Sequence, residues 1–307
     1  VPAAGTVDAV LDGSAGQGMG QIPCFSVKHD DIPSGSYHEH TIYTTRGIKT
    51  DGGFQVHPAF IRSDGSIRNF IYVGAYGRSA GATSVSGVNQ ETNKTRSSTR
   101  ATCRGRGIGW HQSGFWDYNA VQWLYITEYQ DMNSQRALGN GCTSGNSTAF
   151  TLPTGLSNPH GNGSANKYTS SNTDYMSYRG IENLWGKTWE WLDGINIQDG
   201  NVYTTSDSSV WTDDTANNYD YSGTVTLVVG QYIRDFIPGM TLLPASAVGA
   251  SSTTFVGDSV WTKTGWRAFL AGGDAPSGGT GGIFAFNGQE LASRLAIGIG
   301  SRLCYHD

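Results

Sequence analysis

Charged side chains are scarce in this sequence. Asp, Glu, Lys and Arg make up 15% of its 307 residues, the formal net charge is −5, and no long block of like charge occurs. Binding to nucleic acid requires a basic face, so we expect no nucleic-acid partner. The one basic run, residues 94–106, is predicted to be the solvated face of a helix.

Long hydrophobic runs are lacking as well. No apolar run approaches the ~20 residues that a helix needs to cross a bilayer, so we expect no membrane span. The sequence does not begin with Met and shows no signal peptide. We therefore expect a processed chain or a fragment of a longer one.

Cysteine is rare, with four residues at positions 24, 103, 142 and 304. Their spacing matches no zinc-binding pattern, and four cysteines allow three disulfide connectivities. Four free, buried thiols are an equally good interpretation. The sequence leaves both alternatives open.

Glycine and aromatic residues, in contrast, are abundant. The chain contains 43 Gly, 9 Trp, 15 Tyr and 11 Phe. Turn-forming residues with few charges predict a loop-rich β domain, and the aromatic side chains supply enough apolar surface for a core. Residues 155–173, which are mostly Asn, Ser and Gly, are predicted to be a long surface loop.

Tryptophan is concentrated in residues 181–194, which read IENLWGKTWEWLDG. Tryptophan buries a large apolar surface and needs a partner for its N–H. We therefore predict that this segment is the nucleus around which the neighbouring loops fold. Within it we expect a turn running into a short strand, with Trp189 and Trp191 on opposite faces.

Hydrophobic and turn patterns predict the remaining elements. One helix is expected from a cap at Thr92 or Asn93 through about Cys103, and a second over residues 115–130. Residues 60–62 and 70–73 are expected to form one hairpin, and residues 195–197 and 202–205 another. Further strands are expected at 21–27, 37–45, 224–229, 283–286 and 294–299. The glycine-rich residues 1–20 are predicted to be an N-terminal arm or linker, followed by one domain over residues 21–307.

Several segments, in order, resemble a known family. They are HPAF…DG…IYVGAY at 57–76, GxGW at 107–110, YRG with N-x-x-G-x-x-x-E-W at 178–191, and R-A-x-L-x-G-G … G-x-F-A-F … I-G-x-R-L at 267–303. Together they resemble the formylglycine-generating-enzyme type of C-type lectin fold, in the version found in bacteriophage tail and receptor-binding proteins and in variable proteins of diversity-generating retroelements. The resemblance implies an α+β, C-type lectin-like fold with two helices, short twisted antiparallel strands and long loops.

In the retroelement-linked members, the last strands carry a variable ligand-binding surface. The resemblance implies such a site here, and binding sites are enriched in Trp, Tyr and Arg. The candidate residues are Trp266, Asp274, Thr280, Phe284, Asn287, Gln289, Glu290 and Arg294. Core packing is the competing interpretation for Phe284.

The resemblance also implies a function and partners. We expect a bacteriophage virion protein of the tail or fibre, not an enzyme, that binds a host cell-surface glycan or protein. We expect it to be a homo-oligomer, a trimer, whose N-terminal arm contacts other virion proteins. The alternative is a structural tail or capsid decoration protein without its own ligand.

In the resembled fold, the N-x-x-G-x-x-x-E segment binds calcium. The implied side-chain ligands are Asn183 and Glu190, and the implied carbonyl ligands are those of Leu184, Gly186 and Thr188, all hard oxygens that suit calcium. Lys187 departs from the family pattern and could place a cation in the space of the metal. The alternative is that Asn183 and Glu190 bond the loop backbone.

Enzyme chemistry has little support in the residues. The sulfatase-modifying enzymes of this fold use cysteines near the last strands, whereas Cys304 has no second cysteine near it in the sequence. No G-x-S-x-G motif occurs. Glu190 and Asp193 remain a minor candidate pair for glycan hydrolysis. His57 is expected to be a histidine satisfied by the backbone, and His38 and His40 to lie on an exposed strand face rather than on a metal.

Overall fold

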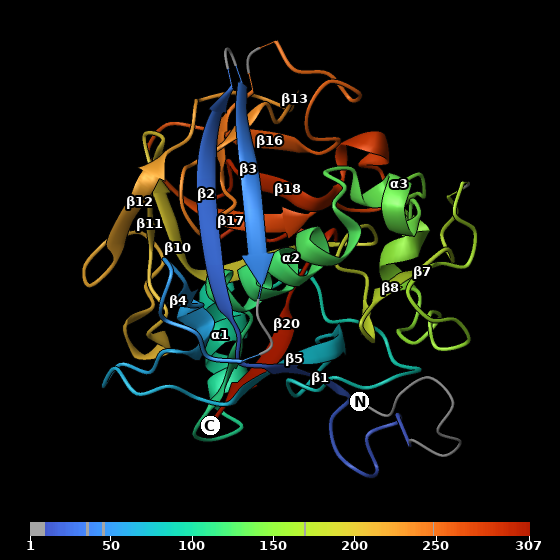
Figure 1. The fold of residues 1–307 in the computed structure, drawn as a ribbon. Coiled ribbons are helices and arrows are strands. Elements are labelled where there is room, and N and C mark those ends of the chain that lie inside the picture. Colours follow the sequence, from blue (N-terminus) through green and yellow to red (C-terminus); the bar gives the residue numbers. More distant parts are fainter. Residues whose placement is uncertain (1–9, 35–36, 45–46, 169, 248) are drawn as a thin grey trace.

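Two sheets and two main helices form the body of the protein (Figure 1). The computed structural model describes residues 10–34, 37–44, 47–168, 170–247 and 249–307, without the side chains of residues 30–46. The fold is α+β, as predicted. Two helices followed by strands and long loops is also the element order that the C-type lectin-like resemblance implies.

The larger sheet has eight strands. Seven of them follow one another in hydrogen-bonded order, and the eighth pairs with one of the seven. Its order is β12 (Asp220–Thr224), β11 (Asn201–Thr204), β10 (Trp189–Gln198), β17 (Trp266–Gly272), β18 (Gly282–Gly288), β16 (Ser259–Thr262) and β13 (Gln231–Tyr232), and β19 (Ile299–Gly300) pairs with β10 in parallel. The hairpin of β10 and β11 confirms the one predicted around the turn at residues 199–200.

The smaller sheet joins the two ends of the described chain. Its order is β1 (Met19–Pro23), β5 (Phe70–Gly77), β20 (Arg302–His306) and β6 (Trp110–Gln112). Because β1 and β20 both pair with β5, the first and last strands lie on either side of one central strand. The predicted boundary at residue 20 therefore falls inside β1, and residues 1–9 of the predicted arm lie outside the described part.

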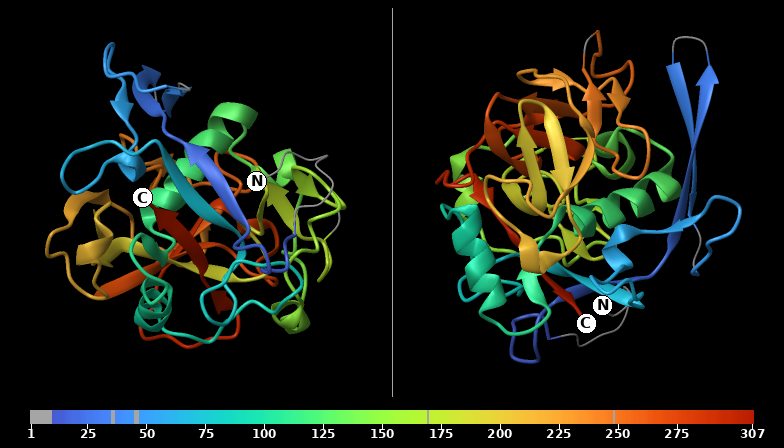
Figure 2. Two further views of the ribbon diagram at one scale, coloured as in Figure 1. Left: turned by 90° about the horizontal axis from the view of Figure 1, so that it is seen from below. Right: turned by 90° about the vertical axis from the view of Figure 1, so that its left-hand side faces the viewer.

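Three smaller sheets surround this body. They are β3 (Tyr37–Thr44), β2 (Ser26–Ser34) and β4 (Gln55–Val56); β7 (Gly163–Ser164), β8 (Met176–Tyr178) and β9 (Ile181–Glu182); and β14 (Asp235–Phe236) with β15 (Pro244–Ser246). The hairpin of β2 and β3 stands beside the body in Figure 2. The short 3-10 helices are η1 (Pro58–Phe60), η2 (Ser147–Thr151), η3 (Ser208–Val210) and η4 (Gly278–Thr280).

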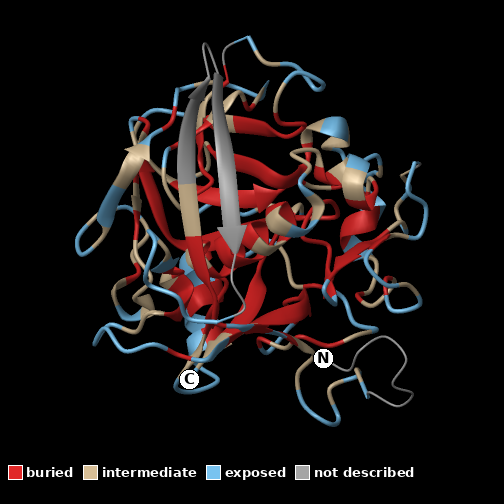
Figure 3. Ribbon diagram, viewed as in Figure 1, coloured by how far each residue is buried: buried red, intermediate tan, exposed pale blue. Residues whose placement is uncertain are grey.

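The helices are α1 (Arg96–Arg104), α2 (Phe115–Tyr129) and the short α3 (Ser134–Leu138). Helix α2 confirms the second predicted helix, and ten of its 15 residues are buried, coloured red in Figure 3. Its buried residues include the polar Asp117, Asn119 and Gln122, each of which is hydrogen-bonded. The Tyr118 hydroxyl donates to the carbonyls of Leu184 and Ile283, so α2 is tied both to the tryptophan segment and to β18.

The tryptophan segment is buried, as predicted. Trp185 and Trp191 are 0% exposed and Trp189 is 8% exposed. The indole N–H of Trp191 donates to the carbonyl of Lys94, and that of Trp185 to the carbonyl of Gly139. The prediction that Trp189 and Trp191 lie on opposite faces is wrong. Both belong to one cluster with Leu270, because side chains two apart on a strand point to the same side.

Some predicted strands are absent or shifted. Residues 58–60 form η1, because Pro58 is fixed near helical φ and His57 caps the turn, so residues 60–62 contribute only a single bridge from Ile61 to Ile67. Strand β5 pairs with β1 and β20 instead of with residues 60–62. The predicted strand at 21–27 is interrupted at Cys24 and Phe25.

Two further predicted strands lie elsewhere. The strand expected at 224–229 is found at 220–224, and of the one expected at 294–299 only Ile299 belongs to a strand. Helix α1 begins after Thr95, whose side chain accepts from the amide of Ser98, rather than after Thr92 or Asn93. Asn93 has a φ of +58°, a left-handed turn that precedes the helix.

The basic run at 94–106 is only partly solvated. Arg104 and Arg106 are exposed, but Arg96 and Arg100 are buried. Arg100 donates to both oxygens of Asp193 at 2.5 and 2.8 Å and to Asp213 at 2.6 Å. The prediction of a fully solvated helix face is therefore wrong, because two of its arginines neutralise acidic groups brought from distant segments.

The described residues contain neither a disulfide nor a helix suited to span a membrane. All four cysteines are free and buried, which decides between the two alternatives that the sequence left open. No helix in the described ranges combines the length and the apolarity that crossing a bilayer requires. The candidate pair His38 and His40 lies outside the described side chains.

His57 gives the stability of this fold a predictable pH dependence. The ring is fully buried, with Nε2 2.9 Å from Asn119 Oδ1 and Nδ1 accepting from the amide of Ala59. The interpretation of a histidine satisfied by the backbone is confirmed for Nδ1 only, because a side chain is the partner of Nε2. Burial lowers the pKa of His57 from 6.5 to about 4. The unfolded chain therefore binds the proton first, and stability is lost as the pH falls from about 6.5 towards 4.

We expect the substitution His57→Gln to reduce this loss. Between pH 7 and 4.5, the drop in the free energy of unfolding should shrink by about 2–3 kcal/mol. Urea unfolding of the wild type and the variant at both pH values measures it. His160→Gln, in a half-buried histidine of the 155–173 loop, is the control. An equal pH-dependent drop in the wild type and His57→Gln would contradict the assignment.

Candidate functional site

The start of β17 and the segment after β18 form the walls of an open pocket of about 490 Å³. It is lined by Lys263, Arg267, Gln289, Glu290, Leu291, Ser293, Arg294 and Leu295. The amide of Ala268 donates to the carbonyl of Glu290, which fixes the segment against the sheet. Three of the predicted ligand-binding residues, Gln289, Glu290 and Arg294, thus come together here, and we call this the β17 pocket.

Six of the eight side chains that line the β17 pocket are polar or charged, and the other two are Leu291 and Leu295. Arg294 is 55% exposed and lies 3.6 Å from the Glu290 carboxylate, an ion pair that solvent screens. The side-chain amide of Gln289 donates to the carbonyl of Thr262, and the backbone amide of Gln289 donates to Asn287 Oδ1. Asn287 therefore supports the pocket without lining it.

Trp266 lies beside the pocket rather than in it. Its ring is 6.0 Å from Tyr203, which is 5.9 Å from Tyr221, and Tyr221 is 60% exposed. Successive strand residues point to opposite faces, so Trp266 and Arg267 point apart. The sequence prediction missed the two tyrosines because they come from β11 and β12, 63 and 45 residues before Trp266.

Asp274 and Thr280 occupy the other end of β17. The Ser277 hydroxyl donates to the Asp274 carboxylate, and the Thr280 hydroxyl donates to the carbonyl of Ser277. Burial raises the pKa of Asp274. These two residues form a separate loop, so the eight predicted residues do not form one surface.

The prediction of Phe284 as a ligand-binding residue is wrong. The ring is 0% exposed and packs against Tyr125 and Phe236 at 5.9 and 5.4 Å. Residue 284 lies in the middle of β18, whose side chains are buried on both faces. The competing interpretation, that Phe284 packs in the core, is therefore confirmed.

The predicted calcium ligands do not fit a calcium ion in this arrangement. Both carboxylate oxygens of Glu190 accept from the Arg302 guanidinium, at 2.6 and 3.0 Å. The same guanidinium contacts the carbonyls of Gly74, Glu182 and Asn183, so five oxygens already surround one protein cation.

Three of the four other proposed ligands are engaged as well, and no such partner is found for the Thr188 carbonyl among the described residues. The Asn183 side chain accepts from the amide of Met176, the Leu184 carbonyl accepts from Tyr118, and the Gly186 carbonyl accepts from the amide of Thr188. For Asn183, the alternative prediction of a hydrogen bond to the backbone is therefore confirmed.

The ammonium of Lys187, which the sequence suggested could occupy the space of the metal, points to another part of the structure. Its ammonium donates to the carbonyl of Leu152 at 2.9 Å and lies 4.8 Å from the ring centre of Tyr175. Burial lowers the pKa of Lys187 to about 8. The cation beside Glu190 is Arg302, a residue 112 positions later in the chain.

The carboxylate pair considered for glycan hydrolysis is also engaged. Glu190 and Asp193 are 3% and 0% exposed, and each is paired with a buried arginine. Hydrolysis requires one carboxylic acid to donate a proton to the substrate. Neither group reaches a surface from which it could do so.

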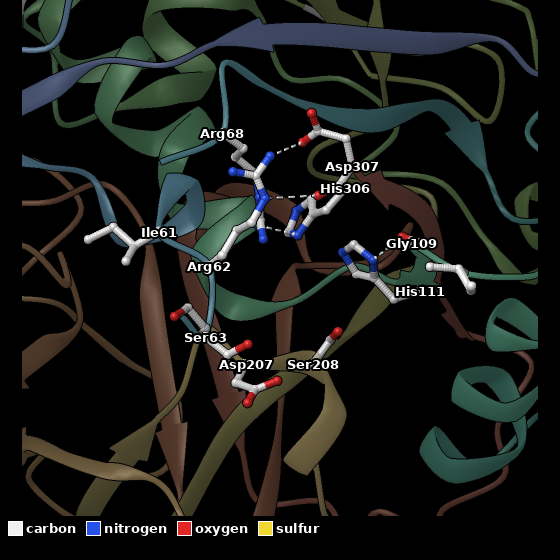
Figure 4. Close-up of a pocket in the computed structure, with 12 residues that line it drawn as sticks. Ile61, Arg62, Ser63, Arg68, Gly109, His111, Asp207, Ser208, His306 and Asp307 are labelled. Atoms are coloured by element: carbon white, nitrogen blue, oxygen red, sulfur yellow. Dashed lines mark hydrogen bonds and ion pairs between the residues drawn. The ribbon is translucent and has the colours of Figure 1, made fainter. Parts of the chain in front are cut away.

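A second pocket, of about 200 Å³, was not predicted (Figure 4). Its walls include Arg62, Arg68, His111, His306 and Asp307. Burial alone would raise the pKa of the adjoining Asp117, but His306 and His111 hold it well below its usual range. Burial also lowers the pKa of His306 to about 4. The histidines were missed because 195 residues separate them in the sequence.

No protein-family model matches the sequence, and no curated protein matches it. The structure is similar to the Major Tropism Determinant U1 variant, with 13% identity, a TM-score of 0.37, and coverage of 76% of this chain and 50% of that chain. For the P3c variant the values are 12%, 0.35, 76% and 50%, and for the I1 variant 11%, 0.36, 97% and 73%. The chain thus spans about half the length of the first two structures. A similarity at this level assigns no ligand and no activity.

We expect calcium to leave the stability of this protein unchanged. A calcium site at a hundred times its dissociation constant would add about 2.7 kcal/mol to the free energy of unfolding. Calcium added to metal-free protein, followed by thermal unfolding, measures this contribution. Magnesium at equal ionic strength is the control. A calcium-specific rise in Tm would show that the Arg302 guanidinium does not fill the site.

Proposed function

We propose that the protein is a receptor-binding protein of a bacteriophage virion, not an enzyme. In this proposal it binds a host cell-surface glycan or protein through the β17 pocket and the neighbouring Trp266. The observation that supports it best is the convergence of charged and amide side chains in one open pocket on a sheet with a buried core. Such side chains can change without unfolding the scaffold beneath them.

The composition of the pocket indicates the chemistry of the ligand. Lys263, Arg267 and Arg294 supply three positive charges and Glu290 one negative charge. Leu291 and Leu295, which are 52% and 54% exposed, add apolar contact area. A ligand with negative charge and some apolar surface, such as an acidic glycan or an acidic protein segment, fits this combination.

The assembly belongs to the same proposal. We expect a homo-oligomer, a trimer, on the virion, with the N-terminal arm contacting other virion proteins. The second candidate function is a structural tail or capsid protein. It draws on the exposed Leu291, Leu295 and Ile297, which a neighbouring subunit would bury.

We expect Trp266→Ala and Arg294→Ala each to weaken binding to host cells about tenfold or more. Truncating a central Trp or Arg of an interface commonly costs 1.4 kcal/mol or more, which is tenfold in affinity. The fluorescently labelled full chain, titrated onto a panel of bacterial cells and purified bacterial surface polysaccharides, measures binding. Thermal unfolding verifies that both variants remain folded.

Matched controls distinguish the site from general effects. Arg179→Ala breaks another exposed Arg–Glu pair, with Glu128, of similar exposure, and Tyr168→Ala removes an aromatic ring that is 83% exposed. Both should bind like the wild type. Equal binding by all four variants would contradict the proposed site. Burial of the pocket in an oligomer that binds none of the panel would instead support the structural function.

A further inference from the structure

Side chains suited to binding a transition metal meet beside the pocket of Figure 4. His111 lies on β6, Asp117 in the first turn of α2, and Cys304 on β20. One ligand atom from each lies within 4.8 Å of the other two, and all three residues are buried. The proposed receptor-binding function does not use them.

The hydrogen-bond partners of His111 and His306 show which ring nitrogens carry protons. His306 Nδ1 is 2.7 Å from a guanidinium nitrogen of Arg68, which only donates, so this ring nitrogen accepts. The proton of His306 is therefore on Nε2, which donates to Asp117 Oδ1 at 2.6 Å. His111 Nδ1 is 2.9 Å from the carbonyl of Gly109, which only accepts, so Nδ1 of His111 carries a proton.

One further contact depends on whether Nε2 of His111 also carries a proton. His111 Nε2 lies 3.2 Å from Asp117 Oδ2. In a neutral His111 this nitrogen has a lone pair and no proton, so it faces a carboxylate oxygen that also has only lone pairs. A cation between the two atoms removes the repulsion, and the Cys304 sulfur lies within 4.8 Å of a ligand atom of each of these residues.

We propose that His111 Nε2, Asp117 Oδ2 and Cys304 Sγ bind a divalent transition-metal ion. Imidazole, carboxylate and thiolate together suit zinc, which takes four ligands at about 2.0–2.3 Å. Ligand atoms of a tetrahedral site are then ~3–4 Å apart, so a small rotation of side chains closes the present spacing.

The groups around these three residues are those that a metal site requires. A ligating histidine usually donates its other N–H to a carbonyl, as His111 does to Gly109. The Asp117 carboxylate is held by His306 and by the amide of Gly114 at 2.8 Å. The rings of His111 and His306 both line the pocket, which gives the ion a path and leaves room for a water as fourth ligand.

The competing explanation needs no metal. A doubly protonated His111 would donate from Nε2 to Asp117 and form a buried ion pair. The two explanations differ in the proton on Nε2 of metal-free His111 and in the part played by Cys304, which an ion pair leaves unused.

Cobalt(II) binding to the reduced, metal-free full chain separates the two explanations. We expect one cobalt per chain, the intense visible bands of tetrahedral cobalt, a thiolate-to-cobalt charge-transfer band, and displacement of cobalt by zinc. Cys304→Ser should lose the charge-transfer band and bind at least tenfold more weakly. Cys103→Ser, in another fully buried cysteine, should behave as the wild type.

A second measurement covers the case in which Cys304→Ser does not fold. Nitrogen-15 NMR of the wild-type histidines should show an unprotonated Nε2 in metal-free His111, and zinc should shift that resonance. No cobalt bands, with His111 doubly protonated, would overturn the proposal. Cobalt bands that persist unchanged in folded Cys304→Ser would overturn it as well, because the ion would then be bound elsewhere.

Discussion

The buried contact of Arg302 with Glu190 holds the two main sheets together. Arg302 belongs to β20 of the smaller sheet and Glu190 to β10 of the larger one. The same guanidinium bonds the carbonyl of Gly74 on β5 and that of Glu182 on β9. Removing one partner of such a pair leaves an uncompensated charge in the interior and typically costs 3–5 kcal/mol.

A second charged contact repeats this arrangement three residues further along β10. Asp193, also on β10, pairs with Arg100 of α1, and the fully buried Arg96 donates to the carbonyls of Leu192 and Ile195. Strand β10 therefore receives arginines from both sides while its tryptophans pack into the core. The proposed binding surface lies at the ends of the central strands β17 and β18, beside β10. Its side chains can vary because the strands beneath them are fixed in this way.

The sequence predicted the elements that local patterns determine. The long segment rich in apolar and aromatic residues at 115–129 specifies α2, and the apolar run at 283–286 specifies β18. It could not predict contacts between distant residues, such as Arg302 with Glu190, 112 positions apart. The same limit applies to the calcium prediction, because a segment that supplies oxygens does not show which cation they surround.

The predicted binding site was recovered in part for the same reason. Gln289, Glu290 and Arg294 are close in sequence and share one pocket, whereas Trp266 meets Tyr203 through strand pairing that no local pattern reveals. Phe284 shows the limit of residue type as a guide, since an aromatic ring serves a core as well as a binding surface. Likewise, His111, Asp117 and Cys304 become one cluster only when β6, α2 and β20 meet.

A double-mutant cycle on Arg302 and Glu190 tests the central contact most directly. The variants are Arg302→Met, Glu190→Gln and the two combined, and urea unfolding gives each free energy of unfolding. Each single change should cost about 3–5 kcal/mol, and the double change at least 2 kcal/mol less than the sum of the two. Additive costs, or single costs below about 1 kcal/mol, would show that the sheets are held together without this contact.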